Sequence, residues 1–125
     1  MKPRLNPRRS GEHFESIAKH YLEAEGLIAV ESNYSCRLGE IDLIMRAASK
    51  TIVFVEVKFR KSSIFGHPVE MVGPSKQRKI RLTAAHYLSH HPALRKLNCR
   101  FDVVGIMNKQ GSSEKQIDWI KNAFF

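Results

Sequence analysis

The sequence predicts an α/β domain in which helices flank a mixed central sheet, with the elements in the order α-β-β-β-α-β-β. Two segments have the apolar spacing of amphipathic helices, and five are rich in the β-branched and aromatic residues that favour strands. A chain of 125 residues has room for one such domain with one hydrophobic core.

The first helix is predicted to begin at Gly11. Ser10 is in position to cap it and Gly26 to stop it. Residues 1–10 have no periodicity and are predicted to form a flexible basic arm, which leaves 11–125 as the single domain. The apolar residues of the helix recur with the 3.6-residue period of a helix that buries one face: Phe14, Ile17, Ala18, Tyr21 and Leu22.

The remaining elements follow in order along the chain. A second helix opens at Ser75 and ends near His91, with apolar residues on one side. Residues 61–74, which precede it, are rich in Ser, Gly and Pro and are predicted to form a long irregular loop, a kind of segment that is often functional or mobile. The predicted strands are Leu27–Tyr34, Gly39–Arg46, Thr51–Arg60, Cys99–Met107 and a last one around Gln116–Ile120.

Three ionisable residues lie where the pattern predicts the centre of a sheet, namely Asp42 in the second strand and Glu56 and Lys58 in the third. A buried charge is costly unless it is paired or binds a metal. If a five-residue loop joins the two strands, Arg46 opposes Ile52 and Asp42 directly opposes Glu56, with Cβ atoms about 5 Å apart. A hard divalent cation would remove the repulsion between the two carboxylates. We therefore expect a metal site here; a structural Lys–Glu pair is the alternative.

Glu15 is the helical carboxylate that is placed to join this cluster. Because each helical residue advances by about 100°, Glu15 lies on the edge of the apolar stripe beside Leu22, whereas Glu12 faces solvent. Glu15 is therefore expected to lean over the margin of the sheet. The alternative is a boundary glutamate that only flanks the apolar stripe.

The formal net charge is +9, and the basic residues are clustered. Such clusters favour a polyanion as the partner, most simply a nucleic acid. Charge alone also leaves open a soluble protein that is merely basic. The clusters are Arg4, Arg8 and Arg9; Lys58, Arg60 and Lys61; Lys76, Arg78, Lys79 and Arg81; and Arg95, Lys96 and Arg100.

The sequence also predicts a cytoplasmic protein without a membrane anchor. No apolar run approaches the roughly 18 residues of a membrane span, and the basic N-terminus is not followed by the apolar stretch of a secretory signal. Cys36 and Cys99 form neither a CxxC motif nor a regular framework, so we expect two buried or half-buried thiols in a reducing cytosol.

Several segments together resemble a known family. Gly39-Glu-Ile-Asp-Leu-Ile and Val53-Phe-Val-Glu-Val-Lys-Phe-Arg resemble the metal-binding core of the PD-(D/E)XK nuclease superfamily. Over nearly its whole length the chain is similar to the bacterial YraN-like family, whose members are considered distant relatives of Holliday-junction resolvases. Further similarity lies in Gly11-x-x-x-Glu15-x-x-Ala18-x-x-Tyr21-Leu22, Phe65-Gly66-x-Pro68-x-Glu70, Lys76, Arg100-Phe-Asp-Val-Val and Asn122-Ala-Phe. The chain departs from the pattern at Ile41, where the superfamily has proline, and at Phe14, where the family usually has glycine.

The resemblance implies an αβββαβ core of the restriction-endonuclease type that hydrolyses phosphodiester bonds with Mg²⁺ or Mn²⁺. Asp42 and Glu56, with the main-chain carbonyl of Val57, would hold the metal. Lys58 would orient or deprotonate the attacking water, and Glu15 would be an outer ligand, direct or through water. Phosphate contacts are expected from four basic residues, Arg60, Lys61, Lys76 and Arg78.

The predicted function is thus that of a metal-dependent endonuclease, with DNA favoured over RNA and branched DNA among the candidate substrates. A nucleic-acid-binding protein with a vestigial, inactive site is the alternative. The sequence leaves the preferred substrate open, and also the oligomeric state, for which a homodimer is one option.

Overall fold

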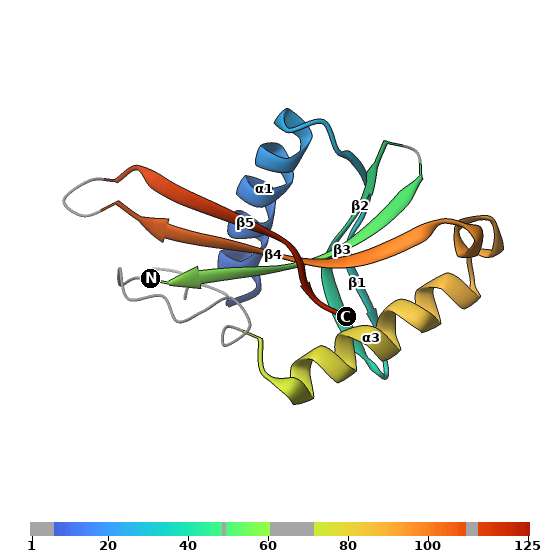
Figure 1. Ribbon diagram of the computed structural model, residues 1–125. Helices are drawn as coiled ribbons and strands as arrows, with labels where there is room; N and C mark the ends of the chain where they lie inside the picture. The colour runs from blue at the N-terminus through green and yellow to red at the C-terminus, as the bar shows by residue number, and fades with distance from the viewer. Residues whose placement is uncertain (1–6, 49, 61–71, 110–112) are drawn as a thin grey trace.

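The computed structural model describes residues 7–48, 50–60, 72–109 and 113–125, with side chains from residue 13 onward. Its elements form one sheet with helices against it (Figure 1). In chain order they are α1 (Pro7–Ala24), β1 (Ile28–Cys36), β2 (Gly39–Ala47), β3 (Thr51–Arg60), α3 (Pro74–Ser89), a 3₁₀ helix η1 (Pro92–Lys96), β4 (Asn98–Asn108) and β5 (Lys115–Phe124).

The predicted order of helices and strands is confirmed, and β3 has the predicted bounds. The predicted start of the first helix is wrong, because α1 begins at Pro7 and Ser10 lies inside it rather than capping it. Proline suits the first turn of a helix, where its missing N–H is not needed. The last four residues assigned to the basic arm therefore belong to α1, and the rest of the arm lies outside the described residues. The last strand is also longer than predicted and runs to Phe124.

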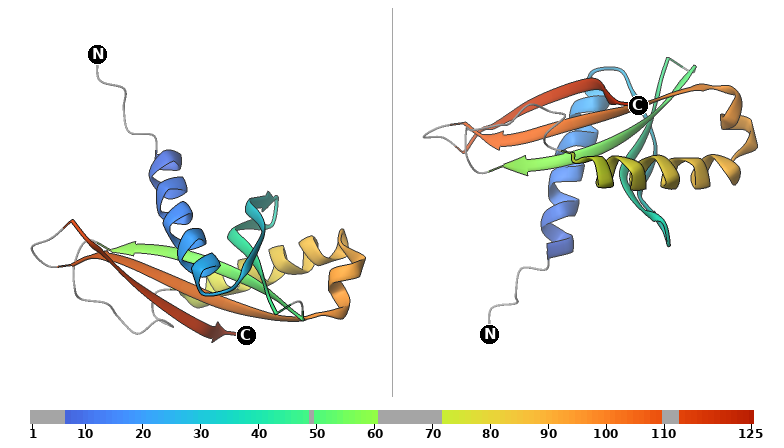
Figure 2. Two further views of the ribbon diagram at one scale, coloured as in Figure 1. Left: turned by 90° about the horizontal axis from the view of Figure 1, so that it is seen from above. Right: turned by 60° about the horizontal axis from the view of Figure 1, so that its bottom comes forward.

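The sheet has the strand order β1-β2-β3-β4-β5 and is mixed, as predicted. β3 and β4 are parallel, with α3 in the connection between them, and the other neighbouring strands are antiparallel. The sheet is strongly twisted, so that β1 and β2 run across the direction of β4 and β5 (Figure 2). In the β2–β3 pair Arg46 opposes Ile52, which is the predicted register.

Two hydrophobic clusters form the core, and each includes apolar side chains of one helix, α3 in the first and α1 in the second. Apolar residues of α3, such as Ile80 and Tyr87, pack with Ile44 and Phe54 of the sheet. On the α1 side Ala18 and Leu22 pack with four residues of β2 and β3: Leu43, Met45, Val53 and Val55. Because successive side chains of a strand point to opposite faces, β2 and β3 supply both clusters and are the central layer of the domain.

No helix in the described ranges is long and apolar enough to cross a membrane. Cys36 and Cys99 are both free thiols; Cys36 is half-buried, as predicted, but Cys99 is exposed, so the prediction that both are at least half-buried is wrong for Cys99.

Candidate active site

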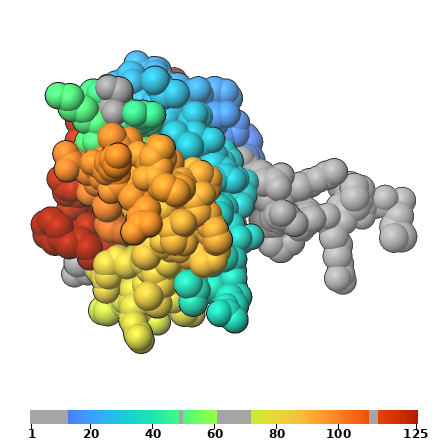
Figure 3. All heavy atoms as spheres, turned by 90° about the vertical axis from the view of Figure 1, so that its right-hand side faces the viewer, coloured from blue at the N-terminus to red at the C-terminus, as the bar shows by residue number. Residues whose placement is uncertain are grey.

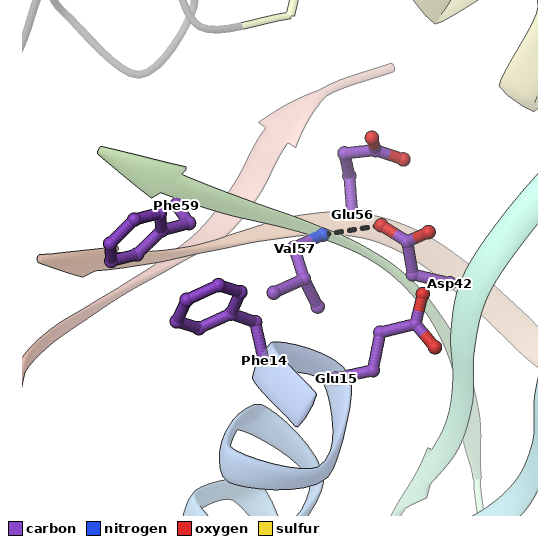
Figure 4. A pocket seen from close by; sticks show the side chains of 6 residues that line it. All are labelled: Phe14, Glu15, Asp42, Glu56, Val57 and Phe59. Atoms are coloured by element: carbon purple, nitrogen blue, oxygen red, sulfur yellow. Dashed lines mark hydrogen bonds between the residues drawn. The ribbon is translucent and has the colours of Figure 1, made fainter. Parts of the chain in front are cut away.

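A pocket of about 210 Å³ lies beside the C-terminal part of β3 and contains the predicted acidic residues. Figure 4 shows the carboxylate of Asp42 between Glu15, which reaches in from α1, and Glu56 of β3. The complete lining is Phe14, Glu15, Asp42, Glu56, Val57 and Phe59. Three carboxyl groups from two strands and one helix thus share a single pocket.

The pocket forms where β2 and β3 stop pairing. The last backbone pair of their ladder is Leu43–Val55, one position before Asp42 and Glu56. The predicted register is confirmed as far as Leu43–Val55, and Asp42 and Glu56 occupy the next opposed position, just beyond the last backbone pair. There, the main-chain N–H of Val57 donates a hydrogen bond of 2.8 Å to Oδ2 of Asp42. The carboxylate thus satisfies a backbone donor at the point where the ladder ends.

Asp42 has a perturbed acidity. The pKa of its carboxyl is raised from 3.8 to about 6, chiefly by burial and also by the charge of Glu15 and a hydrogen bond with the Glu15 carboxyl, while the Val57 N–H and Lys76 oppose the rise. Two carboxyl groups can share a hydrogen bond only if one of them holds a proton. The Asp42–Glu15 pair therefore favours the binding of a proton, or of a cation in place of the proton.

Glu56 is only 5% exposed, and two lysines neutralise it. The ammonium group of Lys58 lies 3.5 Å from its Oε1, and that of Lys76, from the first turn of α3, lies 3.2 Å from the same oxygen. Burial and the charge of Asp42 raise the pKa of Glu56, and the two lysines offset part of this rise. Burial lowers the pKa of Lys76, but the carboxylates around it, led by Glu56, raise it above its ordinary value.

The aromatic side of the pocket comes from α1 and β3. The rings of Phe14 and Phe59 are stacked, with centroids 4.0 Å apart. Because Phe14 directly precedes Glu15, this contact holds the turn of α1 that carries the carboxylate against the sheet.

The four predicted phosphate-binding residues differ in their surroundings. Arg60 and Arg78 are exposed, and Nη1 of Arg60 donates to the Phe59 carbonyl at 3.0 Å. Lys61 lies outside the described residues. Lys76 is paired with Glu56, so it is part of the acidic cluster and not simply a surface residue. Sequence analysis missed this pairing because it depends on how α3 docks, for which a lysine in a first helical turn is no signal.

The carboxylate oxygens that line the pocket are the type of ligand that Mg²⁺ and Mn²⁺ prefer. Mg²⁺ in particular is commonly bound through one or two carboxylates, with waters and substrate phosphates completing its shell. In the described part of the chain, however, no three or more His, Cys, Asp or Glu side chains form a group that could hold a metal ion in the present conformation. Asp42 instead contacts Glu15, and Glu56 contacts the two lysines.

A second buried charge lies outside the pocket. Asp102 of β4 is fully buried, and it accepts hydrogen bonds from Arg100 Nε at 3.1 and 3.2 Å, from Trp119 Nε1 at 2.9 Å and from the Asn122 main-chain N–H at 3.0 Å. All its partners lie on β4 and β5, so this network ties the edge strand to the sheet. An aspartate inside an apolar strand is the signal that could have revealed it.

Comparison with known proteins places the chain in a family. The sequence profile described as "Uncharacterised protein family UPF0102" matches residues 14–106. The chain belongs to the UPF0102 family. The UPF0102 protein of Nitrosococcus oceani is 43% identical over 124 residues, which cover 99% of this chain and 97% of that protein. UPF0102 proteins of Coxiella burnetii (46% over 116 residues, 93% and 92%) and Saccharophagus degradans (45% over 115 residues, 92% of both) are similarly related.

The segment that matches the UPF0102 profile contains the complete pocket lining and both lysines that contact Glu56. It ends within β4, before β5 and the Trp119 side of the Asp102 network.

Proposed function

We propose that this UPF0102 protein is a metal-dependent nuclease that hydrolyses phosphodiester bonds in nucleic acid, with DNA favoured and branched DNA among the candidates. The observation that carries the proposal is the gathering of Glu15, Asp42 and Glu56 around one pocket at the end of the β2–β3 ladder, with Lys58 on Glu56. The resemblance of the Gly39–Ile44 and Val53–Arg60 segments to the PD-(D/E)XK superfamily supports the same conclusion.

Asp42, Glu56 and the main-chain carbonyl of Val57 would hold Mg²⁺ or Mn²⁺. The bound ion supplies a water of lowered pKa and neutralises charge that develops on the phosphate. Asp42 and Glu15 repel each other when both are ionised, and a cation bound to Asp42 would offset that repulsion.

The side chains of the protein orient the reactants. Lys58 projects from β3 next to Glu56 and is 21% exposed, so its ammonium group can reach a water or a phosphate oxygen beside Glu56. It orients the attacking water by hydrogen bonding and stabilises the extra negative charge of the transition state. Glu15, on the opposite side of Asp42, accepts hydrogen bonds from water in the outer shell of the site. Arg60 and Arg78 contact the backbone of the nucleic acid without reading its bases.

A nucleic-acid-binding protein without catalytic activity is the second candidate, and one observation favours it. Both lysines neutralise Glu56, and the described residues form no group of three or more metal-ligating side chains. A site that has lost its metal would keep this arrangement, together with the basic surface.

Cleavage assays separate the two candidates. Labelled linear, single-stranded, flapped and four-way-junction DNA and matching RNA are incubated with Mg²⁺, with Mn²⁺ or with EDTA. A nuclease cleaves at least one of them in a metal-dependent manner, and Asp42→Asn or Glu56→Gln abolishes the cleavage. The control is Asp118→Asn, which alters an exposed aspartate of β5 outside the pocket. Binding without cleavage by the wild-type protein under all conditions would establish the second candidate.

A further inference from the structure

Lys76 makes a contact that a simple phosphate-binding lysine would not make. Its ammonium group lies 3.2 Å from Oε1 of Glu56, nearer than that of Lys58 at 3.5 Å. The Glu56 side chain is 5% exposed, whereas that of Lys76 is 44% exposed. Lys76 therefore reaches from a solvent-accessible position on α3 to a buried carboxylate.

The same side chain lines a second pocket, of about 200 Å³, on the α3 side of β2. This pocket carries two lysines, Lys76 and Lys79, against one carboxylate, that of Glu40, and its remaining lining is Gly39 and Ile80. An excess of ammonium groups in a solvent-open pocket favours an anionic group such as a phosphate. Lys76 thus lies between a buried carboxylate that favours its positive charge and a pocket that favours it only when an anion is bound there.

The backbone that carries Lys76 is held in place at this point. Gly39 has a φ of +152°, and a Cβ atom there would lie 2.9 Å from Oγ1 of Thr83, so only glycine lets the β1–β2 hairpin approach α3 this closely. The Thr83 hydroxyl donates to the Lys79 carbonyl at 2.7 Å. Figure 3 shows the hairpin beside α3 on this surface. With the helix fixed, Lys76 can change partner only by rotating its flexible side chain.

We propose that Lys76 couples metal binding to nucleic-acid binding: it neutralises Glu56 while no divalent cation is bound, and it turns to a backbone phosphate in the pocket beside Lys79 when a cation occupies the site. This inference rests on the proposed function. A divalent cation on Glu56 supplies the positive charge that Lys76 supplies in its absence, and it repels the ammonium group at this short range. The released ammonium group then adds to the phosphate-binding surface. By linkage, nucleic acid must in turn tighten the binding of the cation.

Two measurements on the full-length wild-type protein, Lys76→Met and Lys79→Met test this coupling. The first is Ca²⁺ affinity by calorimetry without nucleic acid, since Ca²⁺ takes the same oxygen ligands. The second is the affinity for a fluorescent single-stranded DNA with and without Ca²⁺, with gels to check that the DNA stays intact. Lys79→Met is the matched control, because Lys79 lines the same pocket from the same helix but makes no ion pair with Glu56.

Lys76→Met should bind Ca²⁺ more tightly than the wild-type protein, because no ammonium group competes for Glu56, and Lys79→Met should bind it as the wild type does. Ca²⁺ should tighten DNA binding about fivefold or more in the wild type. Lys79→Met controls the Ca²⁺ affinity only, because Lys79 lines the pocket that would hold the phosphate. The enhancement should be clearly smaller in Lys76→Met, where only direct contact between the ion and a phosphate remains. Lys76→Gln, which keeps a hydrogen-bond donor without the charge, should repeat both results.

The inference is wrong if Lys76→Met and Lys76→Gln bind Ca²⁺ no better than the wild type, or if Ca²⁺ enhances DNA binding equally in the wild type and in both Lys76 variants. If that happens while the wild type cleaves DNA with Mg²⁺, the proposed nuclease function stands and only the role of Lys76 falls. If the wild type binds no divalent cation, both proposals fall.

Discussion

The main-chain N–H of Val57 donates a hydrogen bond of 2.8 Å to the carboxylate of Asp42, at the point where β2 and β3 stop pairing. Beyond the Leu43–Val55 pair, β2 offers no further main-chain partner to β3, and the side chain of Asp42 provides the acceptor instead. Asp42 is thereby held in contact with Glu15. This enforced proximity has consequences for stability that can be measured without any substrate.

Asp42→Asn should stabilise the protein at about pH 7.5 when divalent cations are removed. Burial, with the adjacent Glu15, raises the pKa of Asp42 to about 6, so its ionised form disfavours the fold near neutral pH. Asparagine keeps an oxygen for the Val57 N–H and offers an N–H group to Glu15. The expected gain in the free energy of unfolding is about 1–3 kcal/mol, measured by urea denaturation in EDTA. The exposed Asp118→Asn control should change it by less than about 0.5 kcal/mol, and a loss of stability in Asp42→Asn would contradict the argument.

The wild-type protein without metal should become more stable as the pH falls from about 7 toward 4. The folded-state pKa of Asp42, about 6, lies above its ordinary value of 3.8, so the folded state binds the proton more tightly than the unfolded state. The stabilisation is complete below the unfolded value and is lost as the pH rises through the folded one. Urea denaturation across this range should show the trend in the wild type and a much flatter one in Asp42→Asn. Equal slopes would assign the trend to other groups.

The sequence alone predicted β3, the register of β2 against β3 and the position of Glu15. The bounds of β3 follow from an uninterrupted β-branched and aromatic run, and the register of β2 against β3 follows from the length of their connection. Glu15 follows from helical geometry. These predictions succeed because they depend on local spacing, which is periodic in both helices and strands.

What the sequence did not predict depends on contacts between distant segments. The pairing of Lys76 with Glu56 requires α3 to dock against the β1–β2 hairpin, which rests on the close approach of Gly39 to Thr83. The β2–β3 ladder ends at the Leu43–Val55 pair, one position before the acidic residues. Spacing along the chain carries no information on either.

Asp102→Ala should destabilise the protein strongly without affecting the pocket. Asp102 is fully buried, and its removal leaves the Trp119 and Asn122 N–H groups and the Arg100 guanidinium without their acceptor. The expected loss is about 3–5 kcal/mol, as for breaking a buried ion pair by removing one partner. Because Trp119 is the single tryptophan of the chain, its fluorescence reports directly on this network.

Asp118→Ala, at an exposed position next to Trp119, is the control for Asp102→Ala and should lose little stability. The folded fraction of Asp102→Ala should bind Ca²⁺ like the wild type. A selective loss of Ca²⁺ binding in that fraction would show that Asp102 belongs to the functional site and not only to the framework.

Catalysis and binding should respond to different substitutions. Lys58→Met should abolish turnover, because it removes the ammonium group that lies 3.5 Å from Glu56. It should change DNA affinity only a few-fold, since it removes one cationic group among many. Replacing the exposed Arg60 and Arg78 together by Met should instead weaken binding to all sequences. It should also lower the slope of log affinity against log salt by about 0.7 for each phosphate of single-stranded DNA that the protein no longer neutralises.

Single-turnover cleavage at saturating DNA distinguishes a defect in catalysis, expected for Lys58→Met, from a defect in binding, expected for the Arg60/Arg78 double variant. The Arg60/Arg78 double variant should cleave at nearly the wild-type rate once the DNA is bound, because neither arginine lines the acidic pocket. Lys58→Met should stay inactive at any DNA concentration. If Lys58→Met cleaved as fast as the wild type in an assay that EDTA still stops, the chemistry would take place at another site or in a contaminant. The charges on β2 and β3 would then be a structural cluster, in which Lys58 and Lys76 do no more than neutralise Glu56.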